Sequence, residues 1–414
     1  MRVRELSLQN FRVFGEQRKF EFSDRVTVVA GVNGRGKTAI LDALALLASR
    51  LLPLISPARS GYLTMAPSEV HGDALEAELG FKVNCAGIPI DFKLTYSRDR
   101  RRLKRTTIHR AVRERVKHEY GDPNRAGDAA PLAVFYTTDR AGFRLPRRLP
   151  TELPREQALA YVRALQSPFV DYRDFMARYR AWIADEGQAR SVMAFNKALA
   201  FFLEGFSELR VEDSPLRLTV SKGSFRLPLN QLSDGERSFL AIISDLVRRL
   251  SLANPDLDDP LHGAGIVLID ELELHLHPTW QRQVVEKLRT TFPNIQFIAT
   301  THSPFVIQSL RPGELINLDP EEFVEYADKS IEDIAENVMG VELPQKSERY
   351  LQMMTAAEEY FRLLRTPTDN AADVNAAEKR LNELAAPFSD DPAFQALLKL
   401  ERETQHGGGG DETR

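Results

Sequence analysis

The segment that decides the fold is Val26-Thr-Val-Val-Ala30 followed at once by Gly31-Val-Asn-Gly-Arg-Gly-Lys-Thr38. The first part is apolar and β-branched, which is typical of a buried strand. The second part matches the pattern G-x-x-x-x-G-K-[ST] and leads into an apolar stretch that predicts a helix from about Lys37 to Arg50. Such a turn lets successive backbone N–H groups face a phosphate. The segment therefore predicts a phosphate-binding loop in an α/β sheet.

We expect every residue of this loop to line a nucleotide site: Gly31, Val32, Asn33, Gly34, Arg35, Gly36, Lys37 and Thr38. Lys37 should reach the β- and γ-phosphates of ATP, and the hydroxyl of Thr38 should bind Mg²⁺. The alternative is a chance glycine turn. The strand before the loop and the helix after it argue against that alternative.

A second apolar strand, Gly265-Ile-Val-Leu-Ile269, ends in the acids Asp270 and Glu271. In a doubly wound sheet, an acid at the carboxyl end of a central strand lies beside the phosphate loop. We expect Asp270 to bind Mg²⁺ through water and Glu271 to polarise the water that attacks the γ-phosphate. The alternative is a solvated acidic turn, in which many strands end.

Two further motifs follow the same logic. Leu232-Ser-Asp-Gly-Glu236 precedes a predicted helix, with Ser233 as N-cap and Glu236 as its capping-box partner. The motif is either that cap alone or a helix N-terminus that binds a nucleotide held by another subunit. His302 ends the strand Ile298-Ala-Thr-Thr-His302 and could point at the γ-phosphate, although an isolated histidine is more often structural.

With these elements in this order, the chain resembles the non-transporter branch of the ABC-type ATPases, which includes SMC, Rad50 and RecF heads and the OLD ATPases. The opening Leu6-Ser-Leu-Gln-Asn-Phe-Arg12 is similar to RecF/Rad50-like heads, which implies that Arg12 contacts nucleotide. The segments Asp270–Pro278 and Thr300–Pro304 are most similar to OLD-like ATPases. Ser330–Gly340 resembles ATPase subunits of Septu-type and retron-linked anti-phage systems.

This resemblance implies a P-loop α/β head of ABC/RecF type, with a helical insertion and a helical C-terminal region. It also implies a head-to-tail dimer that sandwiches two ATP molecules. Ser233, Gly235 and Glu236 would then belong to the nucleotide site of the other subunit, whereas Glu271 and His302 would act in their own subunit. Hydrolysis should loosen the dimer, since the γ-phosphate bonds to both subunits.

The sequence departs from the family pattern at the Q-loop. No glutamine occurs between Gln17 and Gln157, and Tyr136-Thr-Thr-Asp-Arg140 occupies the expected place. His275 and His277, with Glu273, would suit a metal site. The resemblance instead assigns this segment to the D-loop, which faces the dimer partner.

The expected organisation has five parts: an N-terminal ATPase lobe at 1–150, a helical insertion at 151–206, a second ATPase lobe at 207–318, a helical C-terminal region at 319–405 and a flexible tail at 406–414. Apolar spacing predicts helices near 155–166, 170–186, 190–204, 330–338, 346–364, 371–385 and 391–404. A hairpin is predicted from Leu75–Val83 and Pro89–Tyr96. The insertion shows no sustained heptads, which excludes a long coiled-coil arm.

Composition limits the class of protein. The 414 residues include 55 Lys+Arg and 59 Asp+Glu, for a net charge of −4, and the apolar fraction of 43 % excludes global disorder. A single cysteine, Cys85, favours a reducing compartment, and we expect a cytoplasmic protein without a secretory signal or membrane span.

Arg98–Lys117 carries ten basic and two acidic residues (10 − 2 = +8). That run is either a solvated surface or a DNA-backbone site.

We expect an ATP-hydrolysing subunit that forms a homodimer or larger homo-oligomer and gates a partner effector, expected to be a nuclease, in bacterial anti-phage defence. One alternative is a RecF/Rad50-like repair or recombination ATPase. Another is a transporter ATPase subunit, which the missing Q-loop glutamine disfavours. The last is a binding module that uses ATP only as a structural ligand, which Lys37, Asp270 and Glu271 argue against.

Overall fold

The computed structural model describes residues 1–388, apart from the gaps 56–61, 86, 106–107, 109, 121–129, 143–144, 155–156, 167–169, 320–325, 327–328, 340, 342–346 and 366–370. The chain divides into two compact units, Met1–Gly340 and Val341–Arg414. The predicted helix at 391–404 and the predicted tail at 406–414 lie outside the described residues. The first unit contains every candidate site residue.

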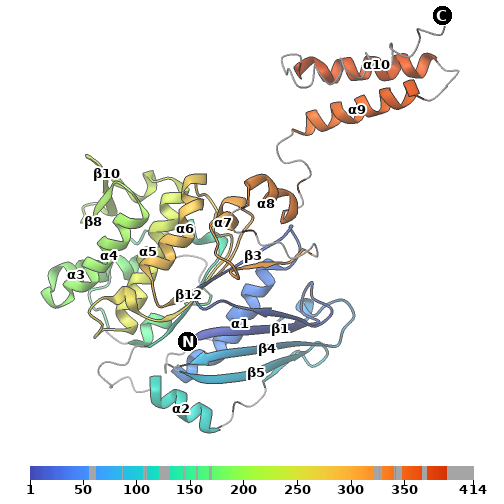
Figure 1. Cartoon of the computed structure of the whole chain (residues 1–414). Helices are drawn as coiled ribbons and strands as arrows, with labels where there is room; N and C mark the ends of the chain where they lie inside the picture. The colour runs from blue at the N-terminus through green and yellow to red at the C-terminus, as the bar shows by residue number, and fades with distance from the viewer. Residues whose placement is uncertain are drawn as a thin grey trace, which may run out of the picture. The chain divides into compact units, whose positions relative to one another are not determined.

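A parallel sheet forms the centre of the first unit (Figure 1). Its strands, in spatial order, are β13 (Leu315–Asn317), β3 (Val26–Ala30), β12 (Ile295–Thr300), β11 (Gly265–Ile269) and β7 (Leu132–Tyr136). Every residue of β3, β7, β11 and β12 is buried, as expected for a sheet that is covered on both faces. Because parallel strands end at one edge, the phosphate loop, Asp270 and His302 follow the same edge. The α/β fold prediction is confirmed.

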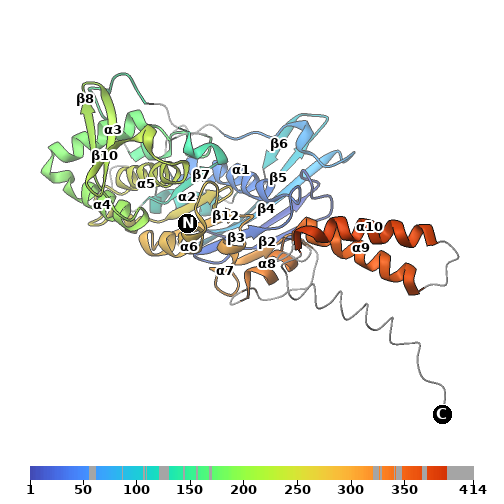
Figure 2. The same ribbon diagram turned by 90° about the horizontal axis from the view of Figure 1, so that it is seen from above.

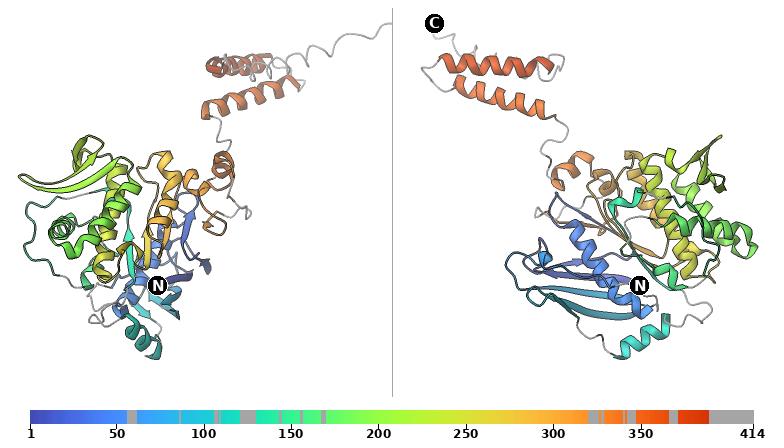
Figure 3. Two further views of the ribbon diagram at one scale, coloured as in Figure 1. Left: turned by 60° about the vertical axis from the view of Figure 1, so that its left-hand side comes forward. Right: turned by 180° about the vertical axis from the view of Figure 1, so that it is seen from behind.

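Helices cover the two faces of this sheet (Figures 1 and 3). α1 (Lys37–Ile55) packs on β7, β11 and β12, whereas α5 (Asp234–Ala253) and α6 (Pro278–Thr291) lie on the other side. α1 runs past its predicted end at Arg50 and through Pro53, since Leu51, Leu52, Leu54 and Ile55 are buried. Among the described helices, α1 alone is long and apolar enough to suit a membrane span, and it is largely buried inside the unit.

An antiparallel sheet lies next to this core (Figure 2). Its order is β2 (Arg18–Glu21), β1 (Arg2–Gln9), β4 (Glu76–Cys85), β5 (Ile88–Ser97) and β6 (Arg102–Arg105). β4 and β5 form the predicted hairpin, and Gly87 between them has a φ of 77°. Residues of the basic run form the edge strand β6 and much of the helix α2 (Arg110–Tyr120).

The insertion contains α3 (Tyr172–Ala184) and α4 (Ala189–Phe202), as predicted. A three-stranded sheet follows, made of β8 (Phe206–Asp213), β9 (Leu216–Lys222) and β10 (Phe225–Pro228). The predicted helix near 155–166 is wrong over its described residues, 157–166, which form a short 3-10 helix at Gln157–Tyr161 followed by turns. The reason is that backbone carbonyls of this segment accept hydrogen bonds from outside it. Arg249 donates to the carbonyls of Ala160 and Val162, and the Phe135 N–H donates to the carbonyl of Ala164.

The remaining helices follow the parallel sheet. α7 (Pro304–Gln308) and α8 (Ile331–Asn337) belong to the first unit. In the second unit, α9 (Glu348–Arg365) and α10 (Ala371–Ala385) pack through a small apolar cluster of their own, which includes Met353, Ala357 and Leu381.

A buried charge network fixes α5 to the sheet and the insertion. Asp245 accepts hydrogen bonds from Arg248 (2.6 Å), Arg249 (2.6 Å) and the hydroxyl of Tyr136 (3.1 Å). Burial disfavours its charge, yet the guanidinium groups of Arg249 and Arg248 prevail and lower the pKa of Asp245 to about 2. Asp245 is therefore ionised in the folded protein at neutral pH, with both arginines as partners.

We predict that D245N lowers the free energy of unfolding by about 3–5 kcal/mol, because it leaves the buried guanidinium group of Arg249 without this counter-ion and Arg248 with Asp174 alone. Urea titration measures the loss, and E114Q, in an exposed pair with Arg110, is the matched control with a change below about 1 kcal/mol. A carboxyl with a lowered pKa contributes stability above its ordinary pKa and loses it as the pH falls through the folded value. The difference in the free energy of unfolding between D245N and wild type should therefore become smaller as the pH falls from 4 toward 2. A pH-independent gap would contradict this assignment.

Candidate functional site

The phosphate loop is shaped by a glycine that contacts the N-terminal segment. Gly36 has a φ of 97°, and a Cβ there would lie 2.5 Å from Val13 Cγ2 and 2.7 Å from the Phe14 ring. No other residue fits this position without moving the loop. Val32, Asn33, Gly34 and Arg35 are exposed, so the loop is open to a ligand from solvent.

Lys37 lies folded beneath this loop. Its Nζ donates to the carbonyl oxygens of Gly31 (2.7 Å) and Val32 (3.1 Å), and its side chain is buried. Burial lowers the pKa of Lys37, and the nearby carboxylates of Asp319 and Glu273 oppose that shift. The ammonium group is thus held at the loop by two carbonyl oxygens, and a phosphate can replace these bonds.

Asp270 and Thr38 meet across the sheet edge, as their positions in the sequence predicted. The Thr38 hydroxyl lies 3.2 Å from both carboxylate oxygens of Asp270. The Thr300 hydroxyl donates to Asp270 Oδ1 at 2.6 Å and fixes the orientation of the carboxylate. Hydroxyl and carboxylate oxygens are the ligands that Mg²⁺ prefers, so these donors fit the ion.

Glu271 has an unusual backbone conformation, with a φ of 48°. Its N–H donates to Thr300 Oγ1 at 2.8 Å, and its carbonyl accepts from Arg140 at 2.6 Å. A non-glycine residue in this region is strained and persists only where its surroundings hold it. Two hydrogen bonds therefore hold the backbone of Glu271 and fix the point from which its side chain extends.

His302 is linked to the Asp270–His277 segment through Glu273. The backbone N–H of His302 donates to Glu273 Oε1 at 2.5 Å, and the Thr301 hydroxyl donates to Oε2 at 2.6 Å. The same carboxylate thus bonds to two consecutive residues beyond β12. The imidazole of His302 is half-buried at the edge where Asp270 and Glu271 also lie.

The predicted capping box at the start of α5 is confirmed. Ser233 Oγ accepts from the Glu236 N–H (3.3 Å), and Glu236 Oε2 accepts from the Ser233 N–H (2.9 Å). Lys222 pairs with Glu236 Oε1 at 2.6 Å, so that carboxylate is fully engaged, whereas Ser233 is exposed. Among the described hydrogen bonds and ion pairs, none joins these residues to residues 31–38. Gly235 instead packs on its own chain: a Cβ there would lie 2.5 Å from His275 O.

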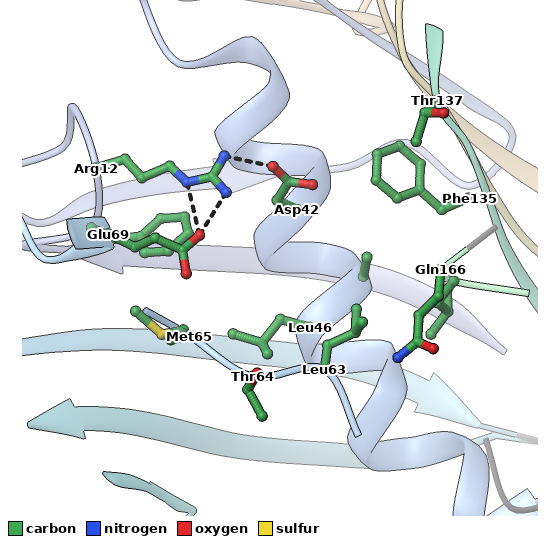
Figure 4. A pocket seen from close by; sticks show the side chains of 13 residues that line it. Arg12, Asp42, Leu46, Leu63, Thr64, Met65, Glu69, Phe135, Thr137 and Gln166 are labelled. Carbon is green, nitrogen blue, oxygen red and sulfur yellow. Dashed lines mark hydrogen bonds and ion pairs between the residues drawn. The ribbon is translucent and has the colours of Figure 1, made fainter. Parts of the chain in front are cut away.

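Arg12 is bound to two carboxylates (Figure 4). Its guanidinium group contacts Asp42 Oδ2 at 2.5 Å and Glu69 Oε1 at 2.6 Å. These groups line a cavity of about 260 Å³ between α1 and the end of β7. Another cavity, of about 320 Å³, adjoins the phosphate loop at Gly34 and Arg35 and is lined by the segment Val13–Glu16. The second cavity therefore borders the phosphate loop itself, whereas the cavity beside Arg12 does not.

Four residues of the site were missed by sequence reasoning: Arg140, Glu273 as a hydrogen-bond partner, Thr300 and Asp319. Asp319 Oδ2 accepts from the Val32 N–H at 2.7 Å, and Oδ1 pairs with Arg35 Nε at 2.8 Å. The available signal was position, because Arg140, Thr300 and Asp319 each lie at or just beyond the carboxyl end of a parallel strand.

The metal alternative for His275 and His277 finds no support in the described part of the chain. No group of three or more histidine, cysteine or acidic side chains that could hold a metal occurs there. His277 caps α6, where its Nδ1 accepts from the Thr279 N–H at 3.3 Å.

We predict that T300V lowers the rate of ATP hydrolysis by about 10–100-fold and raises the Mg²⁺ concentration needed for half-maximal rate, because it removes a hydroxyl that orients Asp270 and accepts from Glu271. Phosphate release against Mg²⁺ concentration measures both effects. T290V, which alters a threonine on the exposed side of α6, is the matched control. An unchanged Mg²⁺ dependence in T300V would contradict the assignment of Asp270.

Comparisons with known proteins identify a family and several relatives of this chain. Residues 26–308 match the family model described as "AAA domain, putative AbiEii toxin, Type IV TA system". The retron Ec83 probable ATPase of Escherichia coli is 29 % identical over 396 residues, covering 75 % of this chain and 70 % of that protein. The Septu protein PtuA of Bacillus thuringiensis is 31 % identical over 210 residues, covering 47 % of this chain and 50 % of that protein.

Among solved structures, the SMC head domain from Thermotoga maritima is 18 % identical and aligns over 75 % of this chain and 92 % of that chain, with a TM-score of 0.41. The matches to retron and Septu proteins confirm the resemblance noted in the sequence. The family match spans more than half of the chain. The chain therefore belongs to the AAA-domain family described as putative AbiEii toxin of Type IV TA systems, and it is an ATPase.

Proposed function

We propose that this ATPase works as a head-to-tail dimer whose ATP-bound state gates a partner effector, expected to be a nuclease, in bacterial anti-phage defence. The observation that carries the proposal is the convergence of Thr38, Asp270, Glu271 and Thr300 at one sheet edge, with an exposed Ser233 at the start of α5. The similarity to a retron ATPase and to PtuA supports the defence role.

In the proposed reaction, the oxygen of a water molecule forms a bond to the γ-phosphorus while the bond to the bridging oxygen breaks. Glu271 takes the proton from that water, and ADP and phosphate leave. Lys37 turns from the carbonyls of the loop to the phosphates. Thr38 and Asp270 would hold Mg²⁺, whose charge would offset that of the phosphates. His302 would contact the γ-phosphate from the end of β12.

The dimer is supported by the state of the Ser233 motif. A helix N-terminus is a ready anion site because its first N–H groups have no partners within the helix. In α5 the capping box satisfies one N–H and leaves Ser233 exposed, and no described bond joins Ser233 to the phosphate loop of its own chain. A γ-phosphate held by one subunit and touched by Ser233 and Gly235 of another would link the two.

We predict that E271Q forms a stable dimer with ATP, because it binds nucleotide yet lacks the base that would remove the γ-phosphate. Light scattering with and without ATP measures the change in mass. S233R, which places a bulky side chain on the exposed cap, should bind ATP without dimerising, and K37A should do neither. If E271Q binds ATP and stays monomeric, the head-to-tail proposal is wrong.

DNA contact is a second candidate function, favoured by the surface of β6 and α2. Arg101, Arg102, Lys104, Arg115 and Lys117 are all exposed there. Val116 is buried and anchors α2, so the cations are held on a folded helix and strand. Clustered cations bind phosphate backbones by releasing condensed counter-ions.

For that surface we predict that R115E/K117E weakens duplex DNA binding and lowers the slope of log affinity against log salt concentration by about one to two. The reason is that each cation that no longer pairs with a phosphate reduces this slope by about one. Fluorescence anisotropy in a salt series measures this slope. R173E, an exposed cation on α3, is the matched control. If R115E/K117E and R173E show the same DNA affinity and the same salt slope, the basic surface is solvated and does not bind DNA.

A further inference from the structure

A buried arginine lies in the segment where the sequence lacks the expected Q-loop glutamine. Arg140 lies in a 3-10 helix, Thr138–Ala141, directly after β7, and is 2 % exposed. Its guanidinium group donates to the carbonyls of Asp270 (2.6 Å), Glu271 (2.6 Å) and Thr137 (3.2 Å). Its Nε donates to the hydroxyl of Ser238 on α5 at 3.0 Å.

The charge of Arg140 persists despite this burial. Loss of solvent lowers its pKa to about 10, and the nearby carboxylates of Glu273, Asp270 and Glu271 oppose that shift. The group is therefore protonated at neutral pH. Hydrogen bonds from a charged donor are stronger than neutral ones, so the carbonyls of Asp270 and Glu271 are firmly held.

These bonds act on a strained backbone position of the site. Glu271 has a φ of 48°, and its peptide groups are fixed from two sides, by Thr300 at the N–H and by Arg140 at the carbonyl. Thr300 belongs to β12, whereas Arg140 follows β7, on the opposite side of β11. Removing either bond would release a strained backbone conformation that persists only because its surroundings hold it.

The same guanidinium group reaches the helix that begins with the Ser233 motif. Ser238 is buried on α5, about one turn beyond Gly235. Gly235 in turn packs against the carbonyl of His275, which follows Glu271 in the chain. The segment 270–275 is thus tied to α5 at two points, by a hydrogen-bonded arginine and by a close backbone approach.

We propose that Arg140 is a positioning residue that holds the backbone of Glu271 and couples it to α5. When Ser233 of one subunit contacts the nucleotide held by the other subunit, this coupling changes the rate of hydrolysis at the first subunit's own phosphate loop. The inference rests on the proposed head-to-tail dimer. Arg140 touches no substrate in this arrangement, since it acts through the carbonyl of Glu271 and the hydroxyl of Ser238.

Two variants separate its two links. R140K keeps the charge but offers one nitrogen in place of three, so it cannot hold both carbonyls and Ser238. S238A removes only the link to α5. The matched control is R289K, because Arg289 is also buried and bonded, to Glu314, away from the site. Each variant is characterised by ATP binding at equilibrium, steady-state kcat with its Hill coefficient, and thermal melting.

We expect R140K to lose at least tenfold in kcat while its Kd for ATP stays within threefold of wild type. S238A should lower the Hill coefficient for ATP toward one with an unchanged Kd. R289K should lower the melting temperature and keep kcat. If R140K loses melting temperature and retains kcat, as R289K does, Arg140 is only structural and the inference fails.

The outcomes also distinguish this inference from the proposed function. If E271Q dimerises with ATP while both R140K and S238A behave as wild type, the dimer stands and the coupling is wrong. If E271Q stays monomeric and wild type shows a Hill coefficient of one, the dimer itself is wrong. Should R140K not fold, S238A still decides the coupling, since a retained Hill coefficient there contradicts it.

Discussion

The site depends on one contact, the meeting of the Asp270 carboxylate with the hydroxyls of Thr38 and Thr300. Asp270 follows β11, Thr300 ends β12 and Thr38 lies beyond the loop that follows β3. Only a parallel register brings the ends of these three adjacent strands together. The fully buried β-branched strands are therefore the physical basis of the chemistry. A shift of one strand would move the carboxylate away from both hydroxyls.

Sequence reasoning predicted the parts of this site that short motifs encode. The phosphate loop, the acids after β11 and the cap of α5 need only neighbouring residues, so local pattern and capping chemistry were sufficient. The hairpin of β4 and β5 followed from alternation and Gly87 for the same reason. The roles expected for Glu271, His302, Ser233 and Arg12 stay predictions.

The rest depends on distant partners that the sequence does not pair. Arg140 bonds to residues more than 90 positions away, and the 3-10 segment at Gln157–Tyr161 exists because Arg249 and β7 take carbonyls that a helix would use. The ion pairs of Arg12 with Asp42 and Glu69 are contacts of the same kind, between residues far apart in the sequence. At Gln157–Tyr161 such tertiary contacts prevailed over the helical pattern of the sequence.

Asp319 ties the phosphate loop to the end of β13. It is the second residue after β13, and its carboxylate bonds to the Val32 N–H and to Arg35. The N–H of the preceding residue, Leu318, donates to the carbonyl of Ala30, directly before the loop. The loop is therefore anchored by the edge strand β13 as well as by β3 and α1, which it joins.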